Sequence, residues 1–213
     1  AIAPERKGVA SFIHQANAMG VYVGLGHSDA TYKEAMAAVD EGASIFIHTY
    51  NAMSGLHHRK PGMVGAAMDS QVISELICDG HHVSPAAVKI LMKVKGKDKI
   101  ALVSDCMSAA GMEDGDYMLG ELPVIVKGDT ARLKDGGNLA GSILKLKNAV
   151  RNIVDWQIAD IFEAIQMASL LPAKSVGIDD VCGKLKAGYD ADFIVLDNNL
   201  DLKATYINGE RLY

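Results

Sequence analysis

Residues 21–29 read VYVGLGHSD, an apolar run that ends in polar residues, and the same arrangement recurs at 44–51 (SIFIHTYN), 72–82 (VISELICDGHH) and 100–105 (IALVSD). Short apolar runs rich in β-branched residues predict buried strands. We therefore expect strands over residues 21–25, 44–47, 72–78 and 100–104.

Helical patterns separate these strands. Residues 32–40 place apolar side chains on one face, and residues 85–94 follow Ser84 as an N-cap with Pro85 in the first turn. A further helix is expected over residues 9–19, before the first strand. A repeated order of strand and helix is typical of a parallel α/β sheet or barrel.

The pattern changes after Asp105. Residues 117–133 alternate apolar and polar side chains around Lys127-Gly128-Asp129, which predicts a β-hairpin. Helices are expected over 142–156 and 158–169, and short strands over 181–213. We expect residues 1–175 to form part of a (β/α)₈ barrel with an inserted hairpin at 117–135, and residues 176–213 to form a small β-rich segment.

Each predicted strand delivers an ionisable side chain at its carboxyl end. These are His27, His48, Asp79 with the adjacent His81 and His82, and Asp105. Active sites of (β/α)₈ barrels are built at this face from the ends of several strands. One histidine alone is more often structural than functional, but four polar strand ends in series predict a shared site.

His27, His48 and Asp105 suit a divalent metal site. Neutral imidazole is the commonest nitrogen ligand, and a nearby carboxylate can transfer a proton from a metal-activated water. A catalytic zinc site usually has three protein ligands and a separate base. His27 and His48 supply two ligands and Asp105 the base, so one ligand is missing. A barrel needs eight strands and typically about 250 residues. We therefore expect the chain to be the C-terminal part of a longer enzyme.

Composition excludes several other classes. The 213 residues carry 21 Lys and Arg against 26 Asp and Glu, a net charge of −5, which argues against nucleic-acid binding. No apolar run is long enough for a membrane span, and no signal peptide is apparent, so a cytoplasmic protein without a membrane partner is expected. The three cysteines predict neither disulfides nor a thiolate zinc site.

Six motifs occur in an order that we recognise. They are GHSDAT at 26–31, HTYNAM at 48–53, HHRKPG at 57–62, DGHHV at 79–83, LVSD at 102–105 and LAGS at 139–142. In these motifs the chain resembles the N-acetylglucosamine-6-phosphate deacetylases of the amidohydrolase superfamily. The resemblance covers the whole chain and about the last three-fifths of that family's length.

The resemblance implies metal-dependent hydrolysis of the acetamide of N-acetylglucosamine 6-phosphate. His27 and His48 would be metal ligands, and Asp105 the general base and acid. The remaining implied roles concern substrate: Asn51 and Ala52 at the phosphate, His82 on the substrate, and a sugar pocket lined by Leu139, Ala140, Gly141 and Ser142. The metal would be zinc or iron, and the resemblance leaves one or two ions open.

Arg59 corresponds to an arginine that the family uses for phosphate in the neighbouring subunit of a homodimer. The fork of a guanidinium matches a phosphate dianion. Lys60 departs from the family's usual glutamate. The family's metal-binding glutamate and a His-x-His pair belong to a half that these residues do not include, so weak metal binding is expected from this chain alone.

Two other functions remain open. Another amidohydrolase, such as a dihydroorotase-like or dipeptidase-like enzyme, would share the strand-end ligands without the HTYNAM motif and Arg59. A non-catalytic fragment would bind the sugar phosphate without turnover. The LAGS motif could likewise be only a turn and N-cap at the start of the helix expected from residue 142.

Overall fold

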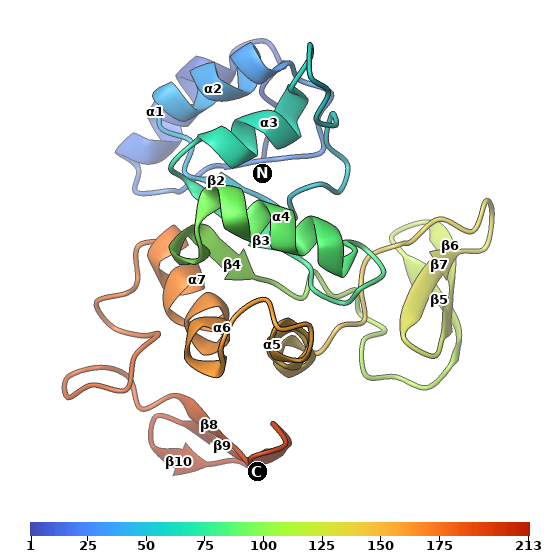
Figure 1. Ribbon diagram of the computed structural model, residues 1–213, viewed down its shortest axis with the longest axis vertical. Helices are drawn as coiled ribbons and strands as arrows, with labels where there is room; N and C mark the ends of the chain where they lie inside the picture. The colour runs from blue at the N-terminus through green and yellow to red at the C-terminus, as the bar shows by residue number, and fades with distance from the viewer.

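The computed structural model describes residues 1–213 and has a four-stranded parallel sheet (Figure 1). The strands lie in chain order and are β1 (Gly24–Leu25), β2 (Ile45–Phe46), β3 (Ile73–Leu76) and β4 (Ile100–Leu102). Each lies inside a stretch predicted as a strand and is shorter than predicted. Parallel neighbours need crossover connections, and a helix lies in each of them. The mixed α/β class is therefore confirmed.

The chain has seven α-helices, of which one precedes the sheet, three connect its strands and three follow it. They are α1 (Val9–Ala18), α2 (Tyr32–Asp40), α3 (Gly62–Asp69), α4 (Pro85–Lys95), α5 (Leu146–Asp155), α6 (Ile161–Ala168) and α7 (Leu170–Ser175). A 3₁₀ turn, η1 (Lys97–Lys99), joins α4 to β4. The best predicted helix is α2, which begins at a capping box: Thr31 accepts from the Glu34 N–H, and Glu34 accepts from the Thr31 N–H.

Helices α3 and α7 were not predicted from the sequence, and α5 was predicted to begin too early. Six of the eight residues of α3 are buried, so it lacks the amphipathic pattern that marks a surface helix. The short helix α7 contains Pro172. Helix α5 begins at Leu146 rather than at residue 142, because Ser142 pairs with Cys106 in a parallel bridge beyond the end of β4.

Two small antiparallel sheets lie apart from the parallel one (Figure 1). Their strands are β5 (Gly115–Leu119), β6 (Leu122–Lys127), β7 (Thr130–Leu133), and β8 (Phe193–Leu196), β9 (Leu202–Ile207), β10 (Glu210–Arg211). The first sheet has three strands where a two-stranded hairpin was expected. Gly128 has a φ of 63° and Gly120 a φ of 58° at the first central position of its two-residue turns, as type II′ hairpin turns require.

Two buried clusters hold the parallel sheet from its helical side. One joins Leu25 and Phe46 to α1, α2 and α3, and the other joins β3 and β4 to α4, α5, α6 and α7. The apolar strand residues are packed in these two clusters. The loops that follow the strands carry the polar residues of the candidate site. None of the helices has the length and hydrophobicity of a membrane-spanning segment.

Candidate active site

The polar strand ends of the sequence meet at one edge of the parallel sheet, because parallel strands end on the same side. His27 follows β1, His48 follows β2 and Asp105 follows β4. All three have left-handed backbones, with φ values of 49°, 30° and 48°. Histidine and aspartate tolerate this region better than most residues, but it still costs energy and clusters at functional sites.

His27 and His48 are in direct contact. Their Nε2 atoms lie 2.9 Å apart, and their rings meet edge to face with centroids separated by 4.7 Å. The other ring nitrogen of His48, Nδ1, is 3.2 Å from the carbonyl oxygen of Asn51. A proton on Nδ1 satisfies that carbonyl and leaves the Nε2 lone pair of His48 directed toward His27.

The surroundings of His48 favour its neutral form. The residue is only 7% exposed, and this burial is the main cause that lowers its pKa. The charge of Asp105 acts in the opposite direction, and that of His27 adds to the lowering. A metal ligand must be deprotonated at the nitrogen that binds, so this environment prepares His48 for that role.

The loop after β2 offers backbone donors. Asn51 donates its own N–H and its side-chain amide to the carbonyl of His48, at 3.0 and 3.1 Å, which closes a tight turn. Ala52 follows with a φ of 48°, and the N–H groups of Ala52 and Met53 donate to no acceptor within the chain. Successive free N–H groups on such a turn suit an anion.

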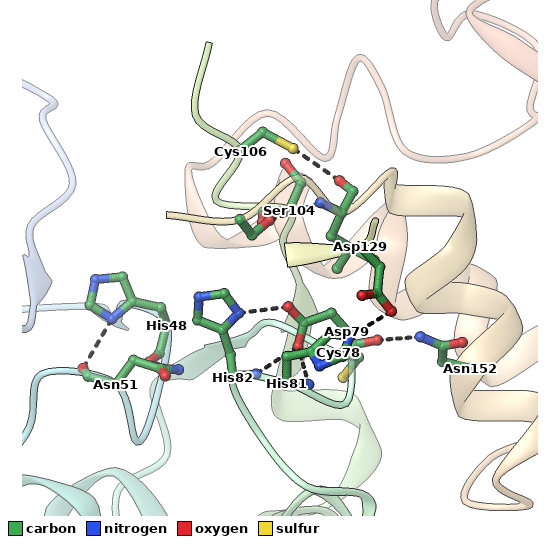
Figure 2. A network of polar contacts seen from close by, with 12 residues as sticks. His48, Asn51, Cys78, Asp79, His81, His82, Ser104, Cys106, Asp129 and Asn152 are labelled. Atoms are coloured by element: carbon green, nitrogen blue, oxygen red, sulfur yellow. Dashed lines mark hydrogen bonds and ion pairs between the residues drawn. The ribbon is translucent and has the colours of Figure 1, made fainter. Parts of the chain in front are cut away.

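Asp79 and His82 form a buried pair after β3, as Figure 2 shows. Their side chains are each 9% exposed, and Asp79 Oδ2 lies 2.6 Å from His82 Nδ1. Asp79 Oδ1 also accepts the backbone N–H groups of His81 and His82, both at 2.8 Å. The imidazole of His82 extends in the same direction as that of His48 (Figure 2). Its Nε2 atom is therefore left for a ligand.

These hydrogen bonds set the charge of Asp79. Burial alone would raise the pKa of Asp79, but the bonds from His82 and His81 together outweigh it and lower that pKa. His81 itself turns away from the pair and reaches Asp129, in the turn between β6 and β7, at 2.7 Å. The β5–β6–β7 sheet is thereby connected to the loop that carries His82.

Arg59 is not joined to the strand-end residues by any hydrogen bond or ion pair. It lies exposed in a turn closed by backbone bonds between His57 and Lys60, and its Nη1 is 2.6 Å from His58 Nε2. The LAGS segment differs, because it runs beside the strand ends. Ala140 donates to the carbonyl of Ala131, and Ser142 is buried against the Asp105 loop.

Comparison with known proteins places this geometry in a family. The sequence model of the Amidohydrolase family matches residues 6–212.

The chain belongs to the amidohydrolase family.

Among curated amidohydrolase relatives, the chain is 46% identical to an N-acetylgalactosamine-6-phosphate deacetylase of Escherichia coli O157:H7 and 41% identical to an N-acetylglucosamine-6-phosphate deacetylase of Vibrio furnissii. These matches cover 99% and 100% of the chain, which spans 55% and 53% of the relatives' lengths. The resemblance noted in the sequence motifs is confirmed.

A solved structure gives the same result for the fold. It is an aspartate-to-alanine mutant of N-acetyl-D-glucosamine-6-phosphate deacetylase from Mycobacterium smegmatis in complex with N-acetyl-D-glucosamine-6-phosphate. The TM-score is 0.94 at 35% identity, and the match covers 99% of this chain and 56% of that one.

Metal dependence is general in the amidohydrolase family, and the donor atoms present fit part of a metal site. The Nε2 atoms of His27 and His48, 2.9 Å apart, would offer two imidazole donors to one divalent ion. No group of three or more His, Cys, Asp or Glu side chains is gathered closely enough to hold an ion. His27 and His48 thus offer two nitrogen donors, fewer than the three protein ligands of a usual zinc site.

Glu75 is a residue that the sequence analysis missed. It lies within β3 and is half-buried, and this burial is the main cause that raises its pKa. The backbone N–H of His48 acts against this rise, and the negative charge of Asp105 adds to it. A charged residue inside a stretch predicted as a buried strand was the available signal.

Proposed function

We propose that this chain carries metal-binding and proton-transfer residues of an enzyme that hydrolyses the N-acetyl group of N-acetylglucosamine 6-phosphate, giving acetate and glucosamine 6-phosphate. The observation that carries the proposal is the contact between the Nε2 atoms of His27 and His48, with Asp105 at the same sheet edge. The identity to two curated sugar-phosphate deacetylases supports this choice of substrate class.

His27 and His48 would hold a divalent metal, zinc or iron, together with further ligands that residues 1–213 do not bring to them. Such an ion supplies a Lewis acid and lowers the pKa of a bound water. Asp105 accepts the proton of the attacking water at its carboxylate. It then delivers that proton to the amide nitrogen as the C–N bond breaks, so that acetate and a free amine leave.

His82 binds and orients the substrate. Asp79 accepts from its Nδ1, which fixes the tautomer and the ring, and Nε2 then contacts the acyl group or a sugar hydroxyl. Leu139, Ala140 and Gly141 line the sugar pocket from the segment beside Asp105.

The phosphate is bound by Asn51, by the free N–H of Ala52 and by Arg59. We propose that Arg59 serves the site of a second subunit in a homodimer, since no bond joins it to the strand ends of its own chain. A guanidinium and backbone amides form charge-assisted hydrogen bonds with a phosphate dianion. They give an acidic chain a local site for an anionic substrate.

We further propose that the parallel sheet belongs to a (β/α)₈ barrel. In this arrangement residues 1–175 contribute to the barrel, with an insertion at 117–135, and residues 176–213 belong to a small β-rich domain. The TM-score of 0.94 with the solved deacetylase, over 99% of this chain, supports the assignment.

N-acetylgalactosamine 6-phosphate is a second candidate substrate. The relative with 46% identity carries that sugar in its name, whereas the one with 41% identity carries the glucosamine name. The two sugars differ only in the configuration of one hydroxyl. A site that hydrogen-bonds this hydroxyl discriminates by kcat/KM, so both epimers belong in the same assay.

The test is acetate release by the purified 213-residue chain with added Zn²⁺ or Fe²⁺. N-acetylglucosamine 6-phosphate, its galactosamine epimer and the unphosphorylated sugars are compared, and binding of each is measured by calorimetry. Phosphate-dependent release supports the proposal. Phosphate-dependent binding without release would favour the non-catalytic alternative. Release from unphosphorylated amides instead would favour another amidohydrolase activity.

A further inference from the structure

The backbone at Asp105 needs support from elsewhere in the chain. Asp105 is exposed, has a φ of 48°, and follows β4 by three residues. No backbone hydrogen bond joins any two of residues 103–107 to each other. A left-handed residue costs of order 1–2 kcal/mol, and it persists only where surrounding contacts fix it.

Ser142 provides that support through its main chain. Its N–H donates to the carbonyl of Asp105 at 3.0 Å, and its carbonyl accepts the N–H of Met107 at 2.9 Å. These two bonds bracket Asp105 and Cys106 in a parallel bridge. The other main-chain hydrogen bond that reaches residues 105–107 from outside is donated by the Ala110 N–H to the Met107 carbonyl, so Ser142 supplies the bonds that flank Asp105 and Cys106.

The Ser142 side chain adds to these main-chain bonds. We call the contacts of Ser142 with residues 104–107 the Ser142 clamp. Its hydroxyl donates to the carbonyl of Ser104, directly before Asp105, and accepts the N–H of Leu144 at 3.0 Å. The residue is 2% exposed. A buried hydroxyl with both a donor bond and an acceptor bond inside the protein is not free for a sugar hydroxyl. The resemblance placed Ser142 at the substrate, but these contacts direct its hydroxyl to the Asp105 loop.

The residues on either side of Ser142 fit this arrangement. A Cβ on Gly141, which has a φ of 66°, would come within 3.3 Å of Met107 Cβ, so a glycine is needed for the close approach. The thiol of Cys106 lies 2.9 Å from the carbonyl of Leu144. The 104–107 and 141–144 segments are thus joined on both sides of Ser142.

We infer that Ser142 is a positioning residue, which holds the backbone of Asp105 so that its carboxylate faces the His27–His48 pair. The inference rests on the proposed function for the role of Asp105, and on the contacts above for the role of Ser142. Asp105 remains the catalytic residue, and Ser142 acts through it.

The first arm of the test needs no turnover. Amide hydrogen exchange by NMR is measured in the 213-residue chain and in Ser142→Ala. We expect the amides of residue 142 and Met107 to exchange on the order of tenfold faster in the variant, the effect of one hydrogen bond. The Asp105 backbone chemical shifts, which report its left-handed φ, should also move. Unchanged exchange and shifts would overturn the inference.

The second arm separates positioning from substrate binding. With N-acetylglucosamine 6-phosphate, Ser142→Ala should lower kcat on the order of tenfold and leave KM within about twofold, since the lost orientation acts on the proton transfer. A raised KM with an unchanged kcat would overturn positioning in favour of a substrate contact. Failure of the unaltered chain to release acetate counts against the proposed function alone, because the exchange arm still decides on Ser142.

Ser175→Ala is the matched control. Ser175 is also buried, at 7% exposure, and its hydroxyl donates to the carbonyl of Pro172 at 2.7 Å within α7. Its loss should lower the melting temperature as much as that of Ser142 without affecting the exchange of residue 142 and Met107 or kcat. Equal effects of both variants on kcat would show that Ser142 acts only through global stability, and would also overturn the inference.

Discussion

The ends of β2 and β4 present the same kind of residue by different means. After β2, His48 is held by Asn51, three residues on, through the Asn51 N–H, its side-chain amide and its carbonyl. After β4, Asp105 is held by Ser142, 37 positions further along the chain. One strand end closes on itself, and the other depends on a distant segment.

This difference predicts how each end responds to change. A turn closed within four residues forms with little loss of chain entropy, whereas a remote clamp requires both segments to be folded first. The Asp105 end should therefore be sensitive to substitutions that leave its own loop untouched. The β3 end resembles the β2 end, since Asp79 and His82 are also three residues apart.

The largest effect is expected from Asp105→Asn. The amide keeps the size of the side chain and the backbone bonds to Ser142, but it cannot accept a proton. We expect kcat to fall by about 10²–10⁴-fold, the usual contribution of a general base. Acetate release measured beside Asp116→Asn, an exposed carboxylate paired with Lys134, checks this. Turnover retained in Asp105→Asn would remove Asp105 from the chemistry.

Asp79→Asn tests a strand end that is closed locally. An amide weakens the bond to His82 Nδ1 and releases the ring, so kcat/KM should fall by about 10–100-fold, as for other partners that orient a functional histidine. Asp129→Asn is the matched control, because it loses an exposed contact to the neighbouring His81. Equal losses in the two variants would mean that the β5–β6–β7 sheet, rather than the Asp79–His82 pair, holds this loop.

Gly141→Ala disturbs the remote clamp without removing a hydrogen bond. Its left-handed backbone and the 3.3 Å approach to Met107 should together lower the free energy of unfolding by roughly 2 kcal/mol. Gly120→Ala has a similar φ of 58° and no atom near its added Cβ, so roughly 1 kcal/mol is expected from strain alone. Urea denaturation of both variants measures the difference. Equal losses of unfolding free energy would show that residue 141 moves away from Met107 at no energetic cost.

The same contrast explains which features the sequence could predict. Strand ends carry their polar residues in sequence order, so His27, His48 and Asp105 could be named as a shared site without coordinates. Helix α2 was predicted because residues 32–40 place their apolar side chains on one face, and the structure adds a local cap from Thr31 and Glu34. The clamp at Ser142 could not be predicted in this way, because its partners lie more than thirty positions away, and its motif resembled a helix start.

Two further misses have the same origin. Helix α3 is buried on nearly all sides, so its sequence lacks the polar face that would have marked it. Glu75 lies inside a strand, and its proximity to Asp105 depends on how β3 and β4 pair. The burial of α3 and the surroundings of Glu75 both depend on tertiary contacts, which local sequence patterns do not reveal.

A second remote contact is made by Lys95. Its Nζ donates to the carbonyls of Ala67 and Ser70 at 2.6 and 3.0 Å, which connects α4 to the end of α3. Burial, with a smaller contribution from the charge of Lys99, lowers the pKa of Lys95 from 10.5 to about 8. Unlike the neutral Ser142 clamp, this contact contains a group that can lose its charge.

The sign of the pH effect follows from proton binding. Below pH 8 the amine is charged in both states, and folding bears the full cost of burying it. Between pH 8 and 10.5 the unfolded chain binds more protons than the folded one, so stability rises with pH. Relative to Lys95→Met, which does not titrate, the free energy of unfolding should rise by about 3 kcal/mol across this window. Denaturation at several pH values measures it, and a flat difference would mean that the two carbonyls keep the amine charged.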